Sequence, residues 1–395
     1  MLALERMRVL DLTQHLSGPY CTMILGDLGA DIIKIEKLED GDDQRKLGPF
    51  VNGESSPFMM INRNKKSVTL NLKSEEGKEI FLKLAKVSDV IVENFRPGIV
   101  KSLGIDYETV KKNNPGIVYC SISGYGQTGP YSRKGGFDIL AQGMTGLMEM
   151  NSESGKRPTK IPISLHDIGA SLVGLYSILS AYICKLTTGV GQYIDVSLVE
   201  SGLSLTVNEA SAYLVNGLVP KVSGTRNHLS APYQAYRAKN GYVIVGAGNQ
   251  SLWEKFCKNV VNRPDWIGDP RFGKVVDRVK NADDLEKIME EVLVQQETSY
   301  WVAKMEEAGV PGGPINSYDQ ALSDPHVLAR DMVLEVDHPK AGRIKTLGMA
   351  AKMSQTPGQI RRPAPMLGQH TVDILNGLLA LTEKEIEDLR LNKII

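Results

Sequence analysis

Short apolar runs alternate with amphipathic helical stretches along the first half of the chain. Strands are predicted at residues 7–14, 31–36, 67–72, 89–93, 117–123 and 191–198. Helices are predicted at residues 20–28, 74–86, 107–113 and 199–216. A further helix of small residues follows a β-like run that ends at Asp167. This alternation predicts an α/β fold, with a doubly wound, mostly parallel, Rossmann-like large domain and right-handed crossovers.

The second half of the chain has a looser pattern that begins at residues 217–233. Strands are predicted at residues 241–246 and 343–347, and helices at 251–261, 283–295, 298–308 and in a pair around 368–391. We therefore expect a second, smaller α/β domain. The expected organisation is the N-terminal part of the large domain at 1–200, a linker at 201–223, the small domain at 224–320, and a linker and C-terminal return to the large domain at 321–395.

Asp167 is the strongest candidate for chemistry. It stands near the predicted start of a helix, where free backbone N–H groups and the helix dipole stabilise an anion. The simplest interpretation is an N-cap. However, Gly169 and Ala170 leave room beside the carboxylate, and Leu165 and Ile168 make its surroundings too apolar for an ordinary solvated cap. An ionised carboxylate in such a place can act as a nucleophile.

Other candidate residues lie on the ligand-binding rim of the predicted sheet, because ligands of doubly wound sheets bind beyond the carboxyl ends of the strands. This rule places residues 13–17, Lys37, 94–96 and 124–129 on one rim. Residues 124–129 match G-x-G-x-x-G, but Pro130 follows them and several strands precede them. An active-site loop is therefore favoured over a dinucleotide-binding turn. A phosphate-bearing nucleotide held by Lys and Arg stays open.

Composition narrows the classes of function. The chain has 395 residues with 46 Lys+Arg and 46 Asp+Glu, so its zero net charge argues against binding to nucleic acid or to a membrane surface. It contains no run of about 18 apolar residues and no signal-peptide pattern. The four cysteines are scattered without a CxxC pair, so we expect a cytoplasmic protein with reduced thiols and no metal site.

A set of short motifs follows one order along nearly the whole chain. They are Leu10-Asp11-Leu12-Thr13, Ser17-Gly18-Pro19, Leu28-Gly29-Ala30-Asp31, Asn62-Arg63-Asn64-Lys65, Glu93-Asn94-Phe95-Arg96-Pro97-Gly98, Ser123-Gly124-Tyr125-Gly126, Gly136-Phe137-Asp138, His166-Asp167-Ile168-Gly169 and Pro365-Met366-Leu367-Gly368-Gln369-His370-Thr371. By these motifs the chain resembles the family III CoA-transferases, which include formyl-CoA transferase and crotonobetainyl-CoA:carnitine CoA-transferase. No single motif is diagnostic, but their number and order together indicate this family.

The resemblance implies an enzyme that moves CoA from an acyl-CoA donor to a free carboxylic acid. Asp167 occupies the position of the family's nucleophile. Its carboxylate would attack the thioester to give a mixed anhydride, and the released CoA would then form an aspartyl-CoA thioester. Coenzyme A would enter and leave as acyl-CoA, and no metal would take part. The resemblance also implies an interlocked homodimer in which each chain forms a ring.

The same resemblance assigns contacts with coenzyme A. The residues carried over are His15, Leu16, Ser17, Lys37, Leu70, Asn71, Leu72, Lys73, Asn94, Phe95, Arg96, Ser102, Gly135, Gly136, Phe137 and Asp138. Two of them depart from the family pattern, because some members carry Arg at the position of Ser102 and Lys at that of Gly135. Arg96, Lys101, Arg133 or Lys134 could supply the charge instead.

Residues 222–250 indicate the class of acceptor acid, because they look most like the branch of the family that handles short dicarboxylic acids. Succinyl-CoA is the leading donor on this resemblance. Arg226 could then hold a distal carboxylate through a bidentate pair. Asn227 and His228 align loosely with the loop that closes over the aspartyl intermediate in formyl-CoA transferase. His166 is expected to be structural, because side chains alternate along a strand and Asp167 would face the other way.

Two alternatives compete with CoA transfer. An α-methylacyl-CoA racemase has the same fold and pairs an Asp with a His that follows a Gly, where this chain has Phe137. Phe cannot carry a proton, so this reading is disfavoured. The second alternative is a non-catalytic nucleotide-binding or scaffolding α/β protein, against which Asp167 and its small neighbours argue.

Overall fold

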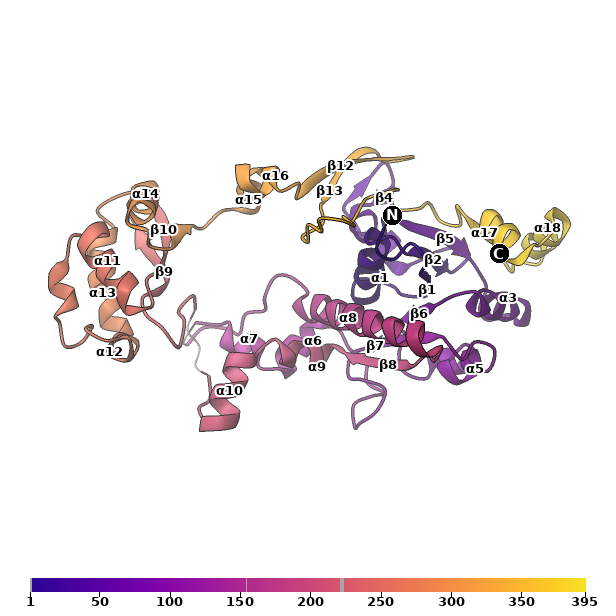
Figure 1. Cartoon of the computed structure of the whole chain (residues 1–395), viewed down its shortest axis with the longest axis horizontal. Coiled ribbons are helices and arrows are strands. Elements are labelled where there is room, and N and C mark those ends of the chain that lie inside the picture. Colours follow the sequence, from indigo (N-terminus) through magenta and orange to yellow (C-terminus); the bar gives the residue numbers. More distant parts are fainter. Residues whose placement is uncertain (1, 154, 221–223) are drawn as a thin grey trace. The chain divides into compact units, whose positions relative to one another are not determined.

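The computed structural model describes residues 2–153, 155–220 and 224–395 and divides into two compact units (Figure 1). Unit 1 comprises Met1–Leu147, Lys160–Val219 and His326–Ile395, and unit 2 comprises Met148–Thr159 and Pro220–Pro325. Part of the linker expected at 201–223 falls on residues 221–223, which lie outside the described residues.

Unit 1 is built on a six-stranded sheet in the order β5-β2-β1-β6-β7-β8. Every strand pair in it is parallel. The strands are β1 (Arg8–Asp11), β2 (Asp31–Glu36), β5 (Lys65–Thr69), β6 (Val90–Glu93), β7 (Val118–Ser123) and β8 (Tyr193–Ser197). Numbered by their order in the chain, these strands have the arrangement of the Rossmann fold. The chain adds strands on one side of β1 as far as β5 and then on the other side from β6, so the switch point lies between β1 and β6. The α/β class and the mostly parallel sheet are thus confirmed.

Helices connect these strands, and a short hairpin of β3 (Phe50–Val51) and β4 (Glu54–Ser55) follows β2. The helical segments before unit 2 are α1 (Ser17–Asp27), η1 (Asp43–Lys46), α2 (Ser56–Ile61), α3 (Glu75–Lys86), α4 (Ile99–Ser102), α5 (Tyr107–Lys111), α6 (Asp138–Met144), α7 (Leu147–Met150), α8 (Leu165–Thr188), α9 (Leu198–Ser204) and α10 (Val207–Asn216).

Apolar side chains cover both faces of the sheet, because each buried strand points alternate residues to opposite sides. On β1, Leu10 joins a core with α3, α5 and the C-terminal helices, whereas Val9 joins a core with α1 and α8. The C-terminal segments are α16 (Pro325–Ala329), β12 (Val333–His338), β13 (Gly342–Leu347), α17 (Thr371–Leu379) and α18 (Glu383–Leu391). Leu375 of α17 is fully buried in the first of these cores, so the chain end is part of unit 1.

Three local predictions differ from the structure. Residues 161–164 are irregular rather than β-like, and α8 begins at Leu165. The strand expected at 67–72 lies two residues earlier, because β5 pairs with β2 from Lys65 onward. The helix expected at 199–216 is divided into α9 and α10, between which Leu205 and Thr206 leave the helical repeat.

Unit 2 has its own core and a three-stranded antiparallel sheet in the order β11-β10-β9. Its elements are β9 (Tyr233–Ala238), β10 (Gly241–Gly246), α11 (Gln250–Lys255), the π-helix η2 (Phe256–Val260), the 3-10 helix η3 (Pro264–Ile267), α12 (Val275–Lys280), α13 (Ala282–Leu293), α14 (Thr298–Ala308), β11 (Gly312–Pro314) and α15 (Tyr318–Ser323). Strand β9, which forms a hairpin with β10, was not predicted. Its buried residues Gln234, Tyr236 and Ala238 alternate, but only one of them is strongly apolar.

Helix α8 has the length and hydropathy of a membrane-crossing helix, and no other described helix does. It packs against α1, β7 and β8 of the sheet. A long core helix of an α/β domain meets the same criteria, so this property is weak evidence for a membrane span.

Candidate active site

Asp167 is the third residue of α8 and is only partly exposed. Ser164, not Asp167, is the N-cap, so the N-cap interpretation is wrong. Burial, and secondly the negative charge of Asp138, raises the pKa of Asp167 to about 7. None of the described residues forms an ion pair with this carboxyl group. Asp167 is therefore a desolvated acid without a counter-ion, in the first turn of a long helix.

Small residues bring α8 close to the rest of the site. A Cβ placed on Gly174 would lie 3.4 Å from Cδ1 of Ile122, so the helix lies directly on β7. One turn after Asp167, the Ser171 hydroxyl donates to the carbonyl of Ser17 at 2.5 Å and to that of Asp167 at 2.7 Å. The hydroxyl ties the start of α8 to the loop that follows β1.

Asp138 begins α6 beside Asp167, and its carboxylate is fully engaged. One oxygen accepts from the backbone N–H of His166 at 2.8 Å, and the other accepts from Gln142 Nε2 at 2.7 Å. His166 is buried and its Nε2 lies 2.9 Å from the Thr145 hydroxyl. The structural role expected for His166 fits this placement, although the strand alternation invoked for it is wrong, because the residue is helical.

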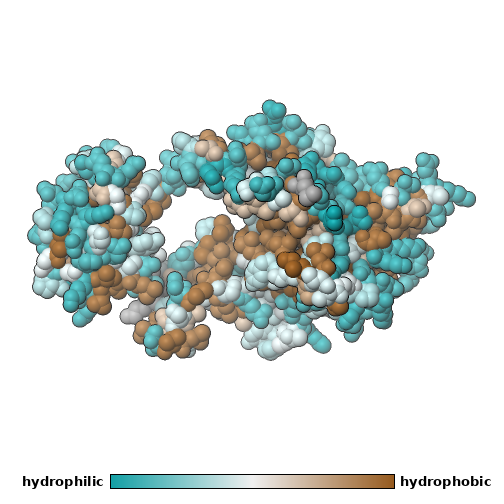
Figure 2. Space-filling model, in the orientation of Figure 1, coloured by the Kyte–Doolittle hydropathy of each residue, from teal (hydrophilic) through white to brown (hydrophobic). Residues whose placement is uncertain are grey.

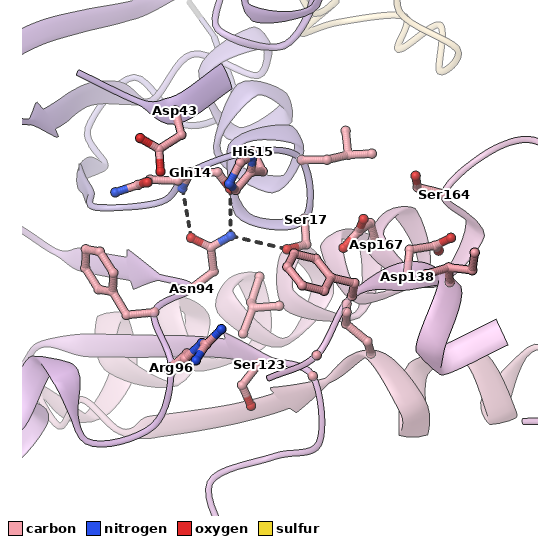
Figure 3. A pocket seen from close by; sticks show the side chains of 18 of the residues that line it. Gln14, His15, Ser17, Asp43, Asn94, Arg96, Ser123, Asp138, Ser164 and Asp167 are labelled. Carbon is pink, nitrogen blue, oxygen red and sulfur yellow. Dashed lines mark hydrogen bonds between the residues drawn. The ribbon is translucent and has the colours of Figure 1, made fainter. Parts of the chain in front are cut away.

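The loops after β1 and β6 meet at the point where the strand order reverses (Figure 3). Asn94 accepts from the backbone N–H of Gln14 at 2.8 Å and donates to its carbonyl at 2.7 Å, and it also reaches the Ser17 hydroxyl at 3.4 Å. His15 holds a left-handed backbone conformation with φ 62°. Rossmann-type sheets bind their ligands at this switch point.

The first loop rests on a network of buried charges. Lys34 is fully buried, donates to the carbonyl of Thr13 at 2.6 Å and pairs with Asp42 at 2.9 Å. Asp42 in turn accepts from the backbone N–H of His15 at 3.1 Å. A Cβ on Gly18 would lie 2.2 Å from the Thr13 side chain, so only glycine fits where the loop enters α1. The position of the loop is thus set by charges beneath it and by close packing.

These segments enclose a cavity of about 720 Å³ in unit 1. Its lining residues are Gln14, His15, Leu16, Ser17, Asp43, Gln44, Asn94, Phe95, Arg96, Pro97, Ile122, Ser123, Gly124, Lys134, Gly136, Phe137, Asp138, Ile139, Lys160, Ser164, Asp167 and Leu198. The volume is sufficient for a sizeable organic ligand. The cavity combines one unpaired carboxyl group with several cations, which suits an anionic ligand that reacts at a carbonyl group.

Three cations line the cavity. Arg96 is exposed, and a Cβ on Gly135 would lie 3.2 Å from its Nη2, so the guanidinium lies against that glycine. Lys134 lies over the ring of Tyr131, and Lys160 donates to the carbonyl of Pro162 at 3.1 Å. None of the three forms an ion pair with another described residue, so each can receive a phosphate or carboxylate group.

The sequence model of one protein family, CoA-transferase family III, matches residues 4–371. The chain belongs to CoA-transferase family III. Succinyl-CoA:glutarate CoA-transferase of Mus musculus is 39% identical to it, covering 100% of this chain and 91% of that protein, and the Homo sapiens enzyme of the same name is 39% identical, covering 98% and 88%. The crystal structure of a CAIB/BAIF family protein from Brucella suis superposes with a TM-score of 0.84 at 34% identity, covering 95% of this chain and 99% of that chain.

The chain is thus a family III CoA-transferase, and its cavity brings together half of the residues that the family resemblance assigned. Those that line the cavity are His15, Leu16, Ser17, Asn94, Phe95, Arg96, Gly136, Phe137, Asp138 and Asp167. Gly135 lies at the edge of this group, beneath the Arg96 guanidinium. Of the substitute cations considered for it, Arg96 and Lys134 lie at the cavity.

Other assigned residues of the CoA-transferase have different surroundings. Lys37 is exposed and pairs with Asp43, which does line the cavity, at 2.6 Å. Leu70 is buried in the hydrophobic core, and Leu72 packs against it. The Asn71 backbone donates to the carbonyl of Ile394, and exposed Lys73 donates its backbone N–H to Asn71. Ser102 is exposed and donates to the carbonyl of its own helix neighbour Ile99. None of these residues lines the cavity.

The three residues assigned to the acid substrate lie in unit 2. The Arg226 guanidinium pairs with Asp283 at 2.6 Å and with Glu286, so the bidentate site expected to hold a substrate carboxylate is taken by two acids of this unit. Asn227 accepts from two backbone N–H groups, which gives it the role of a turn-forming residue. His228 is exposed.

Several cavity residues of the CoA-transferase were not singled out from the sequence. Ser123 was named in a family motif but not assigned a contact; it ends β7, so the strand-end rule could have placed it at the site. Asp43, Gln44 and Lys160 come from connecting segments without a sequence signal of their own. Among the described residues, no group of three or more His, Cys, Asp or Glu side chains is arranged to hold a metal ion.

Asp167→Asn is expected to stabilise the folded CoA-transferase at alkaline pH. The pKa of Asp167 is about 7 in the folded chain and near 4 when unfolded, so the folded state binds the proton more tightly and wild-type stability falls as pH rises from about 4 to 7. Asn cannot ionise, so the variant should gain up to ~4 kcal/mol at pH 8 and nothing at pH 4. Chemical unfolding followed by circular dichroism at the two pH values tests this, and an equal difference at both would contradict it.

Proposed function

We propose that this enzyme transfers CoA from succinyl-CoA to a short dicarboxylic acid, with Asp167 as the nucleophile. The observation that carries the proposal is the Asp167 carboxyl group, desolvated and without a counter-ion, in a cavity at the switch point of a Rossmann-type sheet. A carboxylate that is poorly solvated and unpaired keeps its nucleophilicity. The family membership of the chain supports the same reaction.

The proposed chemistry conserves the activated acyl bond at every step. The Asp167 carboxylate attacks the thioester carbonyl, the C–S bond breaks, and a mixed anhydride and CoA thiolate result. The thiolate attacks the aspartyl carbonyl and releases the donor acid, which leaves an aspartyl-CoA thioester. The acceptor carboxylate attacks this thioester to form a second anhydride, and the thiolate then attacks the acceptor carbonyl. Asp167 is regenerated, and water must be kept from each intermediate.

Two groups of residues would divide the binding of the substrates. The loops at residues 14–17 and 94–97, with Arg96 and Lys134, would hold the anionic CoA portion. The segment that precedes α8, with Lys160 and Ser164, lies near the nucleophile in the chain and lines the same cavity. The names of the mouse and human relatives, both succinyl-CoA:glutarate CoA-transferases, support a dicarboxylic acceptor.

The racemase alternative has no support in the cavity. Phe137 lines it and is exposed, and a phenyl ring cannot exchange a proton in place of the family's His. Asp138 follows Phe137, but its carboxylate is held by His166 and Gln142. An acid already engaged in two hydrogen bonds is poorly placed to act as the second acid–base group.

The experiment is a screen of acceptor acids against succinyl-CoA, with product CoA esters identified by mass. We expect transfer to four- to six-carbon dicarboxylates such as glutarate, and weak transfer to monocarboxylates of equal length. Equal rates with both series would contradict the dicarboxylate assignment. The absence of CoA transfer from any donor tested, succinyl-CoA, acetyl-CoA and formyl-CoA included, would contradict the proposed function.

We also propose that two chains form an interlocked homodimer. Apolar side chains gather on the surface over α8 and α10 (Figure 2). On α8, Tyr176 and Leu186 are 59% and 67% exposed, and on α10, Leu214 and Val215 are 79% and 78% exposed. Such an exposed apolar surface favours a protein partner. Sedimentation at micromolar concentration should give twice the mass of one chain, and a single-chain mass would contradict the dimer.

A further inference from the structure

Gln142 lies on α6, one turn after Asp138, and its side chain is fully buried. Its Nε2 donates to Asp138 Oδ2 at 2.7 Å and to the carbonyls of Ile161 and Ile163 at 3.3 and 3.2 Å. Its Oε1 accepts from the backbone N–H of Ile161 at 2.9 Å. A buried amide whose polar atoms are all hydrogen-bonded is well ordered, because losing any partner would leave a buried polar atom unsatisfied and cost its free energy of desolvation.

The hydrogen-bond partners of this amide are Asp138 and the segment 161–163, and both contact or lead into the first turn of the helix that carries Asp167. Residues 161–163 have no regular secondary structure and lead directly into α8, whose third residue is Asp167. Asp138 also accepts from the backbone N–H of His166, which belongs to the same first turn. One side chain thus fixes both the segment that enters the helix and the carboxylate that holds its first turn.

We propose that Gln142 is a positioning residue for CoA transfer, which sets the place of Asp167 by clamping residues 161–163 and Asp138 together. The inference rests on the proposed function, because it assumes that Asp167 is the nucleophile. Gln142 does not line the cavity, so its effect passes through the groups it holds. Small displacements of a reacting group are costly, and ~1 Å can lower a rate by about 100-fold.

The charges around Asp167 allow the positioning role of Gln142 to be tested a second way, through the pKa of Asp167. Asp138 is the anion that adds to the effect of burial on the pKa of Asp167, and His166, whose pKa is lowered by burial, faces Asp138 at 3.9 Å. The other charged or titratable groups at the cavity are His15, Asp43, Arg96, Lys134 and Lys160. Removing Gln142 frees residues 161–163 to admit water, and hydration of its carboxylate lowers the pKa of Asp167.

Gln142→Met is the test, because it keeps the length of the side chain and removes its hydrogen bonds. We expect kcat to fall about 10- to 100-fold with the KM for succinyl-CoA changed less than about 3-fold, and the acidic limb of the pH profile of kcat/KM to move to lower pH. The matched control is Asn114→Leu, since Asn114 also donates to two backbone carbonyls, those of Ala85 and Ser88, away from the cavity. It should leave the profile unmoved.

Gln142→Glu keeps the inference testable if the Met variant does not fold. While the introduced carboxyl group is protonated it can still donate to Asp138, so activity should be near that of the wild type at the same low pH, and it should fall relative to the wild type as the introduced group ionises. Wild-type kcat and an unmoved profile in a folded variant would overturn the inference. CoA transfer by the wild type, with an adduct on Asp167, would still stand in that case, so the proposed function fails or holds separately.

Discussion

Asp167→Asn is expected to lower the kcat of CoA transfer by at least ~10³-fold, because no other described residue of the cavity offers an unpaired carboxylate to attack the thioester. The substitution keeps the size of the side chain and removes its charge. Binding of acyl-CoA should persist, since the loops at residues 14–17 and 94–97 are untouched. The measurement is the rate of CoA transfer from succinyl-CoA, together with the Kd of the donor.

Trapping the covalent intermediate would show that the loss of kcat in Asp167→Asn reflects the loss of a nucleophile. Hydroxylamine added during turnover should convert an aspartyl anhydride or thioester to a hydroxamate, which peptide mass analysis would locate at Asp167. The matched control is Asp373→Asn, because Asp373 is the third residue of α17 as Asp167 is of α8, yet it is exposed and lies away from the cavity. Full activity of Asp167→Asn, or an adduct elsewhere, would contradict the proposed mechanism.

The place of Asp167 near the start of a helix was accessible to sequence reasoning, whereas its electrostatic state was not. The small residues after Asp167 predicted a helix that packs closely, and Gly174 does lie against β7. The pKa of about 7 depends on Asp138, which is far earlier in the sequence and reaches the site through α6. Such a contact depends on how helices pack, and the pattern of apolar residues within one helix carries no information on it.

The glycine-rich run at residues 124–129 follows β7 rather than β1, and no helix begins directly after it. A Cβ on Gly124 would lie 2.5 Å from the Cα of Gly136, so these two backbones are in direct contact. The run therefore serves close packing between the end of β7 and the segment that carries Phe137 and Asp138. Gly126 and Gly129 both have φ 83°, which favours glycine for a different reason, the left-handed backbone of the turn.

The charged residues inside unit 1 were the hardest to anticipate. Lys34 and Lys65 occur in or beside runs that predict strands, and an isolated lysine in such a run ordinarily points to solvent. Both are fully buried, because Asp11 and Asp42 meet them beneath the first loop. Arg226 shows the opposite error, since a cation expected to receive substrate is paired with acids from α13. Pairing between distant segments decides these cases, and one sequence does not contain it.

Lys65→Met is expected to destabilise unit 1 by ~3–5 kcal/mol, because it leaves Asp11 as a buried charge without its ion-pair partner. Lys65 Nζ lies 2.9 Å from Asp11 Oδ2 and donates to the carbonyl of Pro19, and both side chains are fully buried. Burial opposes ionisation of Asp11, but Lys65 and Lys34 outweigh it and hold the pKa of Asp11 well below its usual range. Burial also lowers the pKa of Lys65, to about 8.

Lys66→Met is the matched control for this loss, because the neighbouring lysine pairs with Asp31 at 2.6 Å while both side chains remain about a quarter exposed. It should cost less than ~1 kcal/mol. Adding Asp11→Asn to Lys65→Met should recover part of the loss, since the uncompensated charge disappears. Unfolding must be followed by circular dichroism, because the three tryptophans, Trp253, Trp266 and Trp301, all lie in unit 2. Equal losses in the two single lysine variants would show that Asp11 and Lys65 are not coupled through burial.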